Sequence, residues 1–186
     1  MSKTKLSLVL YGDSLLGRFG KALIDQLEEC VPGLTVYNCA TGGFNSDDSA
    51  TRAAFIVRLR PTWVLCSVGA NDVAPWKKQV TTARYRKNIR TIMNEFSGSK
   101  MMFLLCPLMH NLRFQKEMNV FNSRITVYNK ITETMAQARG ADIIDAPQAF
   151  SRMFKSGKDY HVGDGVHMNA KAYQVLIREI QAILQS

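Results

Sequence analysis

One serine near the start of this chain, and an aspartate and a histidine near its end, are the residues best suited to chemistry. Ser14 stands in the segment Gly12-Asp13-Ser14-Leu15, directly after an apolar run and before a helical pattern. A serine placed where a buried strand gives way to a helix can act as a nucleophile once a base takes its proton. His167 can supply this base, and Asp164, three positions before it, can supply a carboxylate that orients the imidazole. These residue types predict a serine hydrolase with Ser14, His167 and Asp164 as its catalytic residues.

Ester or amide hydrolysis also needs hydrogen-bond donors for the oxyanion of the tetrahedral intermediate. Three candidates follow strand-like runs, namely the backbone N–H of Ser14, the backbone N–H of Gly43 and the side-chain amide of Asn71. Glycine allows the backbone to come close to a substrate, and an amide donates without carrying charge. We therefore expect these three groups to form an oxyanion hole.

The elements that must position these residues alternate along the chain. Strand-like apolar runs occupy residues 6–11, 34–39, 62–68, 101–106 and 141–145, and helical patterns occupy residues 15–30, 47–59, 82–97, 120–139 and 169–184. Strands that alternate with helices predict an α/β fold, with a doubly wound parallel sheet of about five strands between two layers of helices. At this length we expect one domain over residues 1–186.

In such a sheet the ligand site lies beyond the carboxyl ends of the strands, and the candidate polar residues all follow strands. The connection 107–119 also starts at this edge and is long for a simple turn. It is either a packed surface loop or one wall of a substrate pocket. In the second case Met109, His110 and Phe114 are candidate substrate-binding residues.

The composition is that of an ordinary globular protein, with 46% hydrophobic and 21% charged residues and a net charge of +9. Six bases and no acid lie between Asp72 and Glu95, namely Lys77, Lys78, Arg84, Arg86, Lys87 and Arg90. This run is either a solvated helix surface or a field that attracts an anionic substrate or surface. No recognised nucleic-acid motif accompanies it, and aromatic residues are not interleaved with the bases, so we expect no nucleic-acid partner.

Nothing in the sequence predicts a membrane protein or a secreted one. No stretch approaches the roughly 18 apolar residues of a membrane span, and the apolar run after the basic start is too short for a signal peptide. The four cysteines show no Cys-x-x-Cys spacing and fall mostly in apolar runs, which predicts reduced thiols and a cytoplasmic location.

Taken together, these motifs resemble those of the GDSL, or SGNH, hydrolase superfamily over nearly the whole chain. Ser14 matches its serine, and Gly43, five residues after Asn38, matches its glycine. Asn71 in Gly69-Ala70-Asn71-Asp72 matches its asparagine, and the pair Asp164 and His167 matches its final Asp-x-x-His.

The resemblance implies a flavodoxin-like three-layer fold and ester hydrolysis through an acyl-serine, with no metal and no cofactor. Members include esterases, lysophospholipases, thioesterases and carbohydrate acetylesterases. We expect an esterase for small, short-chain or acetyl esters, with a lysophospholipase or thioesterase on the same site as the alternative. Many relatives have Asp and Thr after the glycine, where this chain has Phe44 and Asn45. Phe44 is therefore a further candidate substrate-binding residue, expected to narrow the region beside the oxyanion hole or to make it apolar.

Three other functions fit parts of the pattern less well. Asp13, Asp72, Asp164 and His167 could hold a divalent cation in a phosphohydrolase, but Ser14 and Asn71 would then have no role. A phosphate-binding loop is disfavoured because Arg18-Phe19 stands where that motif needs Lys followed by Ser or Thr. A catalytically silent binding module on a hydrolase fold remains the non-enzyme alternative.

Overall fold

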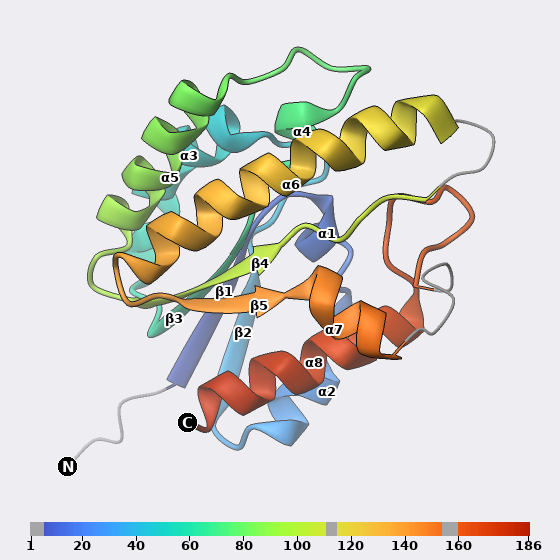
Figure 1. Ribbon diagram of the computed structural model, residues 1–186. Helices are drawn as coiled ribbons and strands as arrows, with labels where there is room; N and C mark the ends of the chain where they lie inside the picture. The colour runs from blue at the N-terminus through green and yellow to red at the C-terminus, as the bar shows by residue number, and fades with distance from the viewer. Residues whose placement is uncertain (1–5, 111–114, 154–159) are drawn as a thin grey trace.

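Five parallel strands form the centre of the molecule (Figure 1). The structure is a computed structural model that describes residues 6–110, 115–153 and 160–186. The strands are β1 (Leu6–Gly12), β2 (Leu34–Asn38), β3 (Trp63–Ser67), β4 (Lys100–Leu105) and β5 (Asp142–Asp145). Their order in the sheet is β2-β1-β3-β4-β5, and every neighbouring pair is parallel. This is the predicted three-layer α/β architecture.

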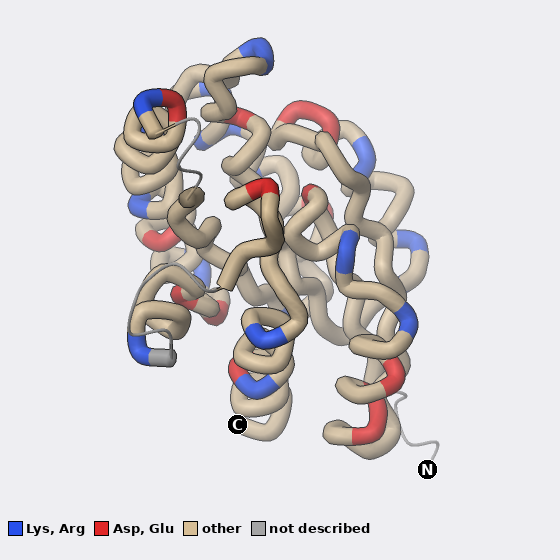
Figure 2. The backbone as a smooth tube through the Cα atoms, turned by 90° about the vertical axis from the view of Figure 1, so that its right-hand side faces the viewer, with Lys and Arg blue, Asp and Glu red and all other residues tan. Residues whose placement is uncertain are grey.

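Helices cover both faces of the sheet, as Figure 1 shows. One layer contains α3 (Ser46–Ile56), which continues into the short 3₁₀ helix η1 (Val57–Leu59), α5 (Thr82–Glu95) and α6 (Gln115–Gln137). The other contains α2 (Lys21–Cys30), α7 (Ala146–Met153) and α8 (Ala170–Leu184). The central strands β1 and β3 carry no charged residue, whereas β4 begins with Lys100 and β5 begins and ends with an aspartate. Most of the charged positions lie on the helices and loops around the sheet (Figure 2). Apolar strands in the middle of a parallel sheet are buried from both sides, which explains their nearly continuous apolar sequences.

The strand order creates a switch point at the centre of the sheet. The chain passes from β1 to β2 on one side, then crosses back to β3 on the other side of β1. The connections after β1 and after β3 therefore leave in opposite directions, and a crevice opens between their carboxyl ends. Ser14 follows β1 and Asn71 follows β3, so the topology brings these two residues to the same crevice.

The helix predicted over residues 15–30 is wrong in one respect, because the structure divides it. A one-turn helix, α1 (Ser14–Gly17), ends before α2 begins at Lys21. The side-chain amide of Asn38, at the end of β2, donates to the carbonyl oxygens of Leu16 and Phe19 at 2.9 and 3.0 Å. Asn38 thus gives the Phe19 carbonyl a partner where the helix is interrupted, and adds a second donor to the Leu16 carbonyl, which also accepts from the Phe19 backbone N–H at 2.9 Å.

Three further elements differ from the sequence prediction. Helix α6 begins at Gln115, so part of the connection predicted over residues 107–119 is helical. Helix α7 was not predicted. It directly follows β5, and the Asp145 side chain caps it by accepting from the backbone N–H of Gln148 at 2.9 Å. The one-turn helix α4 (Ala70–Val73) was also not predicted.

Two observations bear on the membrane and cysteine predictions. No helix within the described residues is long and apolar enough to cross a membrane. All four cysteines of the chain are free thiols in the structure.

Gly12 determines how the chain leaves β1 for the serine. Its φ is +115°, and a Cβ atom at this position would lie 1.8 Å from the carbonyl oxygen of Ser67 on β3. Gly12 and Ser67 are register partners in the sheet, so neither backbone can move away without breaking the pairing of β1 and β3. Only glycine fits here.

We therefore predict that Gly12→Ala destabilises the protein by at least roughly 3 kcal/mol, because it combines a positive φ with a backbone clash. Urea unfolding measures this effect. Gly98→Ala is the matched control, because no atom lies within 4 Å of the added Cβ there. If the two variants unfold at similar urea concentrations, the steric account of Gly12 is wrong.

Candidate active site

Ser14 is the first residue of α1 and lies two residues after Gly12, where β1 ends. The preceding residue, Asp13, caps this helix by accepting from the backbone N–H of Leu15 at 3.0 Å. The Asp13 carboxylate also accepts from the Ser67 hydroxyl at 3.1 Å, which ties the turn to the end of β3. The tight exit at Gly12 and the cap at Asp13 together hold Ser14 at the mouth of the crevice.

His167 lies next to this serine, although 153 residues separate them in the sequence. The His167 Nε2 atom is 3.0 Å from Ser14 Oγ, and its Nδ1 atom is 2.6 Å from Asp164 Oδ2. The ring therefore contacts the hydroxyl through one nitrogen and the carboxylate through the other. This is the geometry in which a carboxylate fixes the imidazole tautomer and the free nitrogen can accept the serine proton.

A compact turn holds Asp164 and His167 in place. Asp164 Oδ1 accepts from the backbone N–H groups of Val166 and His167, both at 2.9 Å. Gly165 adopts a φ of +67°, and its carbonyl oxygen accepts from the backbone N–H of His110 at 2.8 Å. The turn is thus fastened to the segment that leaves β4.

The Asp164 carboxylate is held in its charged form by these contacts. Burial alone would raise its pKa, but the hydrogen bonds from the His167 backbone, the His167 ring and the Val166 backbone lower the pKa below the ordinary value. Arg18 adds a more distant charge, with its guanidinium 4.0 Å from Asp164 Oδ2. A permanent negative charge at Asp164 can stabilise an imidazolium on His167.

The predicted oxyanion donors lie around the same crevice. Ser14, Gly43 and Asn71 all line the cleft described below. Gly42 is close enough that a Cβ atom on it would meet the Ser14 Cβ at 3.7 Å, and Gly43 has a φ of +84°. Among the described residues, the backbone N–H groups of Ser14 and Gly43 donate to no other protein atom. Both are therefore available to a ligand.

The loop of residues 40–45, called the glycine loop below, contains Gly42 and Gly43. Side chains from the segment after β3 hold this loop by its carbonyl groups. The Asn71 side-chain amide donates to the Phe44 carbonyl at 2.8 Å, and Lys77 Nζ donates to the Gly43 carbonyl at 2.9 Å. An amide nitrogen carries two hydrogens, so Asn71 keeps a second donor after bonding Phe44. These two contacts fix the orientation of the peptide groups next to Ser14.

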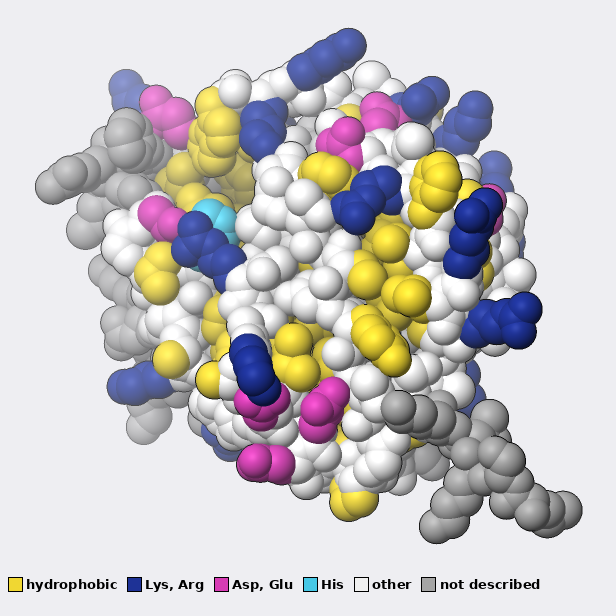
Figure 3. Space-filling view, turned by 180° about the vertical axis from the view of Figure 1, so that it is seen from behind, with side chains coloured by type: hydrophobic (Ala, Val, Ile, Leu, Met, Phe, Trp, Pro, Cys, Tyr) yellow, Lys and Arg dark blue, Asp and Glu magenta, His cyan; other side chains and the backbone are white. Residues whose placement is uncertain are grey.

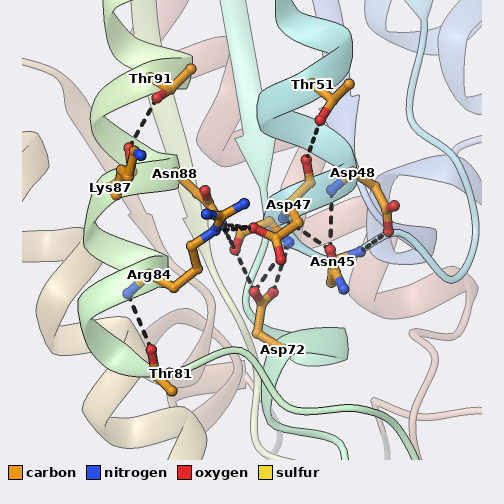
Figure 4. A network of polar contacts seen from close by, with 11 residues as sticks. Asn45, Asp47, Asp48, Thr51, Asp72, Thr81, Arg84, Lys87, Asn88 and Thr91 are labelled. Atoms are coloured by element: carbon orange, nitrogen blue, oxygen red, sulfur yellow. Dashed lines mark hydrogen bonds and ion pairs between the residues drawn. The ribbon is translucent and has the colours of Figure 1, made fainter.

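A buried polar network supports the same loop where it enters α3 (Figure 4). The Asp72 carboxylate accepts from the backbone N–H of Ser46 at 3.1 Å and from the Ser46 hydroxyl. The Asn88 amide donates to the Ser46 hydroxyl and to Asp47, both at 2.8 Å, and Arg84 donates to Asp47 at 2.6 Å. The network joins α3, α4 and α5, so the elements that carry Gly43 and Asn71 move as one unit.

The catalytic candidates open into a cleft of about 540 Å³. Ala74, Trp76, Met109, Phe121 and Val166 form its apolar walls. The Trp76 ring is 56% exposed and stacks on the buried ring of Phe121, with centroids 6.3 Å apart and planes 10° apart. In Figure 3 a hollow with hydrophobic walls is bordered by a histidine side chain and by charged side chains of both signs.

Only one of the predicted substrate-binding residues within the described part of the chain lines the cleft. Met109 lines the cleft, but Phe44 and His110 are not among its lining residues. The ring of Phe44 lies against the guanidinium of Arg52 instead, 5.1 Å from its carbon, so it does not narrow the oxyanion hole as expected. Phe114 lies outside the described residues.

Several residues that line the cleft were not predicted as site residues, among them Trp76, Phe121 and Arg18, and Lys77 was predicted only as part of the basic run. Arg18 could have been found from its spacing, because it follows Ser14 by four residues, or one helical turn. Trp76 and Lys77 follow β3 at the edge where the polar candidates converge. The basic run marked Lys77, but nothing in the sequence distinguishes Trp76 from other loop residues. Phe121 lies on α6, far along the chain, and has no such signal.

The carboxylates of Asp13 and Asp72, proposed as ligands in the metal alternative, serve the loops instead. Both are buried and bonded to backbone and hydroxyl groups that hold the turns. Burial raises the pKa of Asp72 and raises the pKa of Asp13 to about 7, against hydrogen bonds that lower both. One oxygen of Asp13, Oδ2, has no hydrogen-bond partner in the described part of the chain.

Comparisons with known proteins agree with this arrangement. Residues 9–175 match the model of the GDSL-like Lipase/Acylhydrolase family. Among solved structures, the chain is similar to a lipase/acylhydrolase from Enterococcus faecalis, with a TM-score of 0.80, 22% identity and 96% of each chain covered. A search of curated proteins found no match.

Two other similar folds are enzymes by name. LAE5, an α/β hydrolase from the metagenome of Lake Arreo, gives a TM-score of 0.77 at 22% identity, over 95% of this chain and 94% of that one. Axe2, an acetylxylan esterase from Geobacillus stearothermophilus, gives 0.77 at 19% identity, over 95% and 93%. Two further structures of Axe2 are catalytic mutants: a histidine is replaced by alanine in one and a serine by alanine in the other.

The buried Asp13 predicts a dependence of stability on pH. Its pKa is raised in the folded state to about 7 from 3.8, so the folded protein binds more protons than the unfolded chain between these values. Asp13 therefore lowers the free energy of unfolding as the pH rises from about 4 to about 7, by at most about 1.4 kcal/mol per pH unit. Asp13→Asn is expected to remove this contribution.

Urea unfolding at a series of pH values measures it. The control is Asp142→Asn, which replaces an exposed aspartate of β5. If the free energy of unfolding of Asp13→Asn depends on pH in the same way as that of the wild type, the pKa of Asp13 is not raised by folding.

Proposed function

The chain belongs to the GDSL-like lipase/acylhydrolase family, and from this premise we propose that it cleaves small carboxylic esters through an acyl intermediate on Ser14. Esterase or acylhydrolase activity is the property of the family. The observation that carries the proposal of an acyl intermediate on Ser14 is the continuous chain of contacts from Ser14 Oγ to His167 at 3.0 Å and on to Asp164 at 2.6 Å. The serine and histidine of the catalytic Axe2 mutants support the same pair of roles.

The first half of the reaction forms the acyl-enzyme. His167 Nε2 takes the proton of the Ser14 hydroxyl while Oγ bonds to the ester carbonyl carbon. The carbonyl π electrons move onto its oxygen, which becomes the oxyanion of a tetrahedral intermediate. When this intermediate collapses, the bond to the alkoxide oxygen breaks, and the imidazolium gives its proton to the departing alcohol. Asp164 stabilises the imidazolium between these two transfers.

The second half releases the acid. A water molecule gives a proton to His167 Nε2 and attacks the acyl carbon, so a second tetrahedral intermediate forms. Its collapse breaks the bond to Ser14 Oγ, which recovers its proton from His167. One ester and one water are thus converted into one alcohol and one carboxylic acid.

The backbone N–H groups of Ser14 and Gly43 and the side-chain amide of Asn71 are proposed to bind the oxyanion in both halves. In the described part of the chain the two backbone N–H groups donate to no other protein atom, and the Asn71 amide, which donates to the Phe44 carbonyl, keeps a second hydrogen for the oxyanion. The first helical N–H groups also contribute positive potential near the developing charge.

The cleft supports a small substrate. Its volume of about 540 Å³ is in the usual range for sites that bind small molecules. Trp76, Phe121 and Met109 offer apolar contact to a short acyl chain or to the ring of an alcohol. The acetylxylan esterase activity of a similarly folded protein is in keeping with an acetyl or other short acyl group.

Ser14→Ala tests the nucleophile. We predict that hydrolysis of 4-nitrophenyl acetate falls by about 10³-fold or more, because no other group can form the acyl intermediate. The folded structure is expected to persist, as checked by circular dichroism and urea unfolding. Ser123→Ala, an exposed serine on α6, is the matched control. Substantial activity in Ser14→Ala with normal activity in the control would refute the proposal.

Asn71→Ala tests the oxyanion hole. We predict that kcat falls by about 10²–10³-fold while KM changes little, because the amide is needed mainly in the tetrahedral intermediate. Steady-state kinetics with the same ester measures both constants. An increase in KM alone would assign Asn71 to substrate binding and remove it from the oxyanion hole.

A further inference from the structure

The charges that line the cleft do not balance. In the part of the chain that the structure describes, three charged residues line it, namely Arg18, Lys77 and Asp164. The negative charge of Asp164 is already engaged by the His167 ring and by two backbone N–H groups. The two positive charges have no function in the proposed reaction.

Arg18 stands one helical turn after the proposed nucleophile. Its guanidinium lies 4.0 Å from Asp164 Oδ2, the outer limit for an ion pair, and its side chain is 50% exposed. Asp164 thus satisfies little of the hydrogen-bonding capacity of a group with five N–H donors. Arg18 also lies on the side of the site where His167 and Asp164 stand, and there the departing alcohol must receive its proton.

Lys77 also lines the cleft, beside the glycine loop. Its ammonium group donates to the neutral carbonyl of Gly43 at 2.9 Å, and among the described residues no carboxylate forms an ion pair with it. Its charge is felt inside the site, since it lowers the pKa of the buried Asp13 beside Ser14, against the larger effect of burial. Other bases do have acidic partners, as in the pairs Lys21–Asp25, Arg84–Asp47 and Lys130–Glu133.

From this arrangement we propose that the substrate is an anionic ester, with a carboxylate or phosphate group that Arg18 and Lys77 attract into the cleft. The inference rests on the proposed esterase function and names the class of its substrate. Two cations that line a concave, partly apolar site, one only weakly paired with Asp164 and one bonded to the neutral Gly43 carbonyl, focus their field into it and favour a negative ligand. The charge can belong to the alcohol portion, nearer Arg18, or to the acyl portion.

Two matched pairs of esters test the proposal and separate these sources. 4-Acetoxybenzoate and 4-acetoxybenzamide differ in charge on the alcohol portion. The 4-nitrophenyl monoester of glutaric acid and its terminal amide differ in charge on the acyl portion. The quantity measured is the ratio of kcat/KM for the charged ester to that for its neutral amide. A general loss of activity, such as a loosening of the glycine loop when Lys77 is replaced, cancels in this ratio.

We expect the ratio to fall by roughly fivefold or more in Arg18→Gln and in Lys77→Gln for at least one pair. It should also fall as salt is raised from about 0.02 to about 0.5 M in the wild type, because salt screens charges on this scale. The control is Lys78→Gln, which removes the same charge from the neighbouring residue outside the cleft. A ratio that is the same in the wild type, both cleft variants and the control for both pairs would overturn the proposal.

A binding measurement keeps this inference separate from the proposed function. Calorimetry with the Ser14→Ala protein compares the affinities for 4-acetoxybenzoate and 4-acetoxybenzamide. Tighter binding of the anion that is lost in the double variant with Arg18→Gln and Lys77→Gln supports the charge preference, even if the wild type hydrolyses neither ester. Equal affinities for the two compounds contradict it, even if both are hydrolysed.

Discussion

The bridge that His167 forms between Ser14 and Asp164 is the interaction on which the proposed function of this protein depends. It joins the start of the chain to its end, at 3.0 Å on one side and 2.6 Å on the other. Neither loop could provide this geometry alone, because a serine hydroxyl without a base is a poor nucleophile and an imidazole without an orienting group can present the wrong nitrogen. The sheet makes the bridge possible by bringing the carboxyl end of β1 to the edge where the turn after residue 163 is fastened.

The backbone around Ser14 is constrained from three directions. Gly12 lies too close to Ser67 for any side chain, the Asp13 carboxylate ties the turn to β3, and the Asn38 amide fixes the point where α1 ends. Asn71, Lys77 and Asp72 then hold the glycine loop by its carbonyl and N–H groups. A site fixed in this way keeps its N–H donors oriented before a substrate arrives, which is the condition for strong stabilisation of an oxyanion. Part of the cost is the buried, partly unpaired carboxyl of Asp13.

The sequence predicted the features that follow from short-range patterns. The five apolar runs gave the strands, and the residues that follow them gave the edge where Ser14, Gly43, Asn71, Asp164 and His167 gather. The sequence could not predict the break between α1 and α2, because the side chain that donates to the Leu16 and Phe19 carbonyls at this break belongs to Asn38, at the end of β2. Phe44 was expected to shape the region beside the oxyanion hole from its position alone, but its side chain lies against Arg52. Trp76 and Phe121 meet only through the packing of α6 across the sheet, so no local pattern could pair them.

The most direct test of the central claim asks which atom of the protein becomes acylated or phosphonylated. A fluorophosphonate reacts covalently with a serine whose proton a neighbouring base can take. Incubation with this reagent, followed by digestion and mass spectrometry, should locate a single adduct on Ser14, and His167→Ala should abolish it while the protein stays folded. An adduct on a different residue, or labelling of Ser14 that is as fast without His167, would contradict the account.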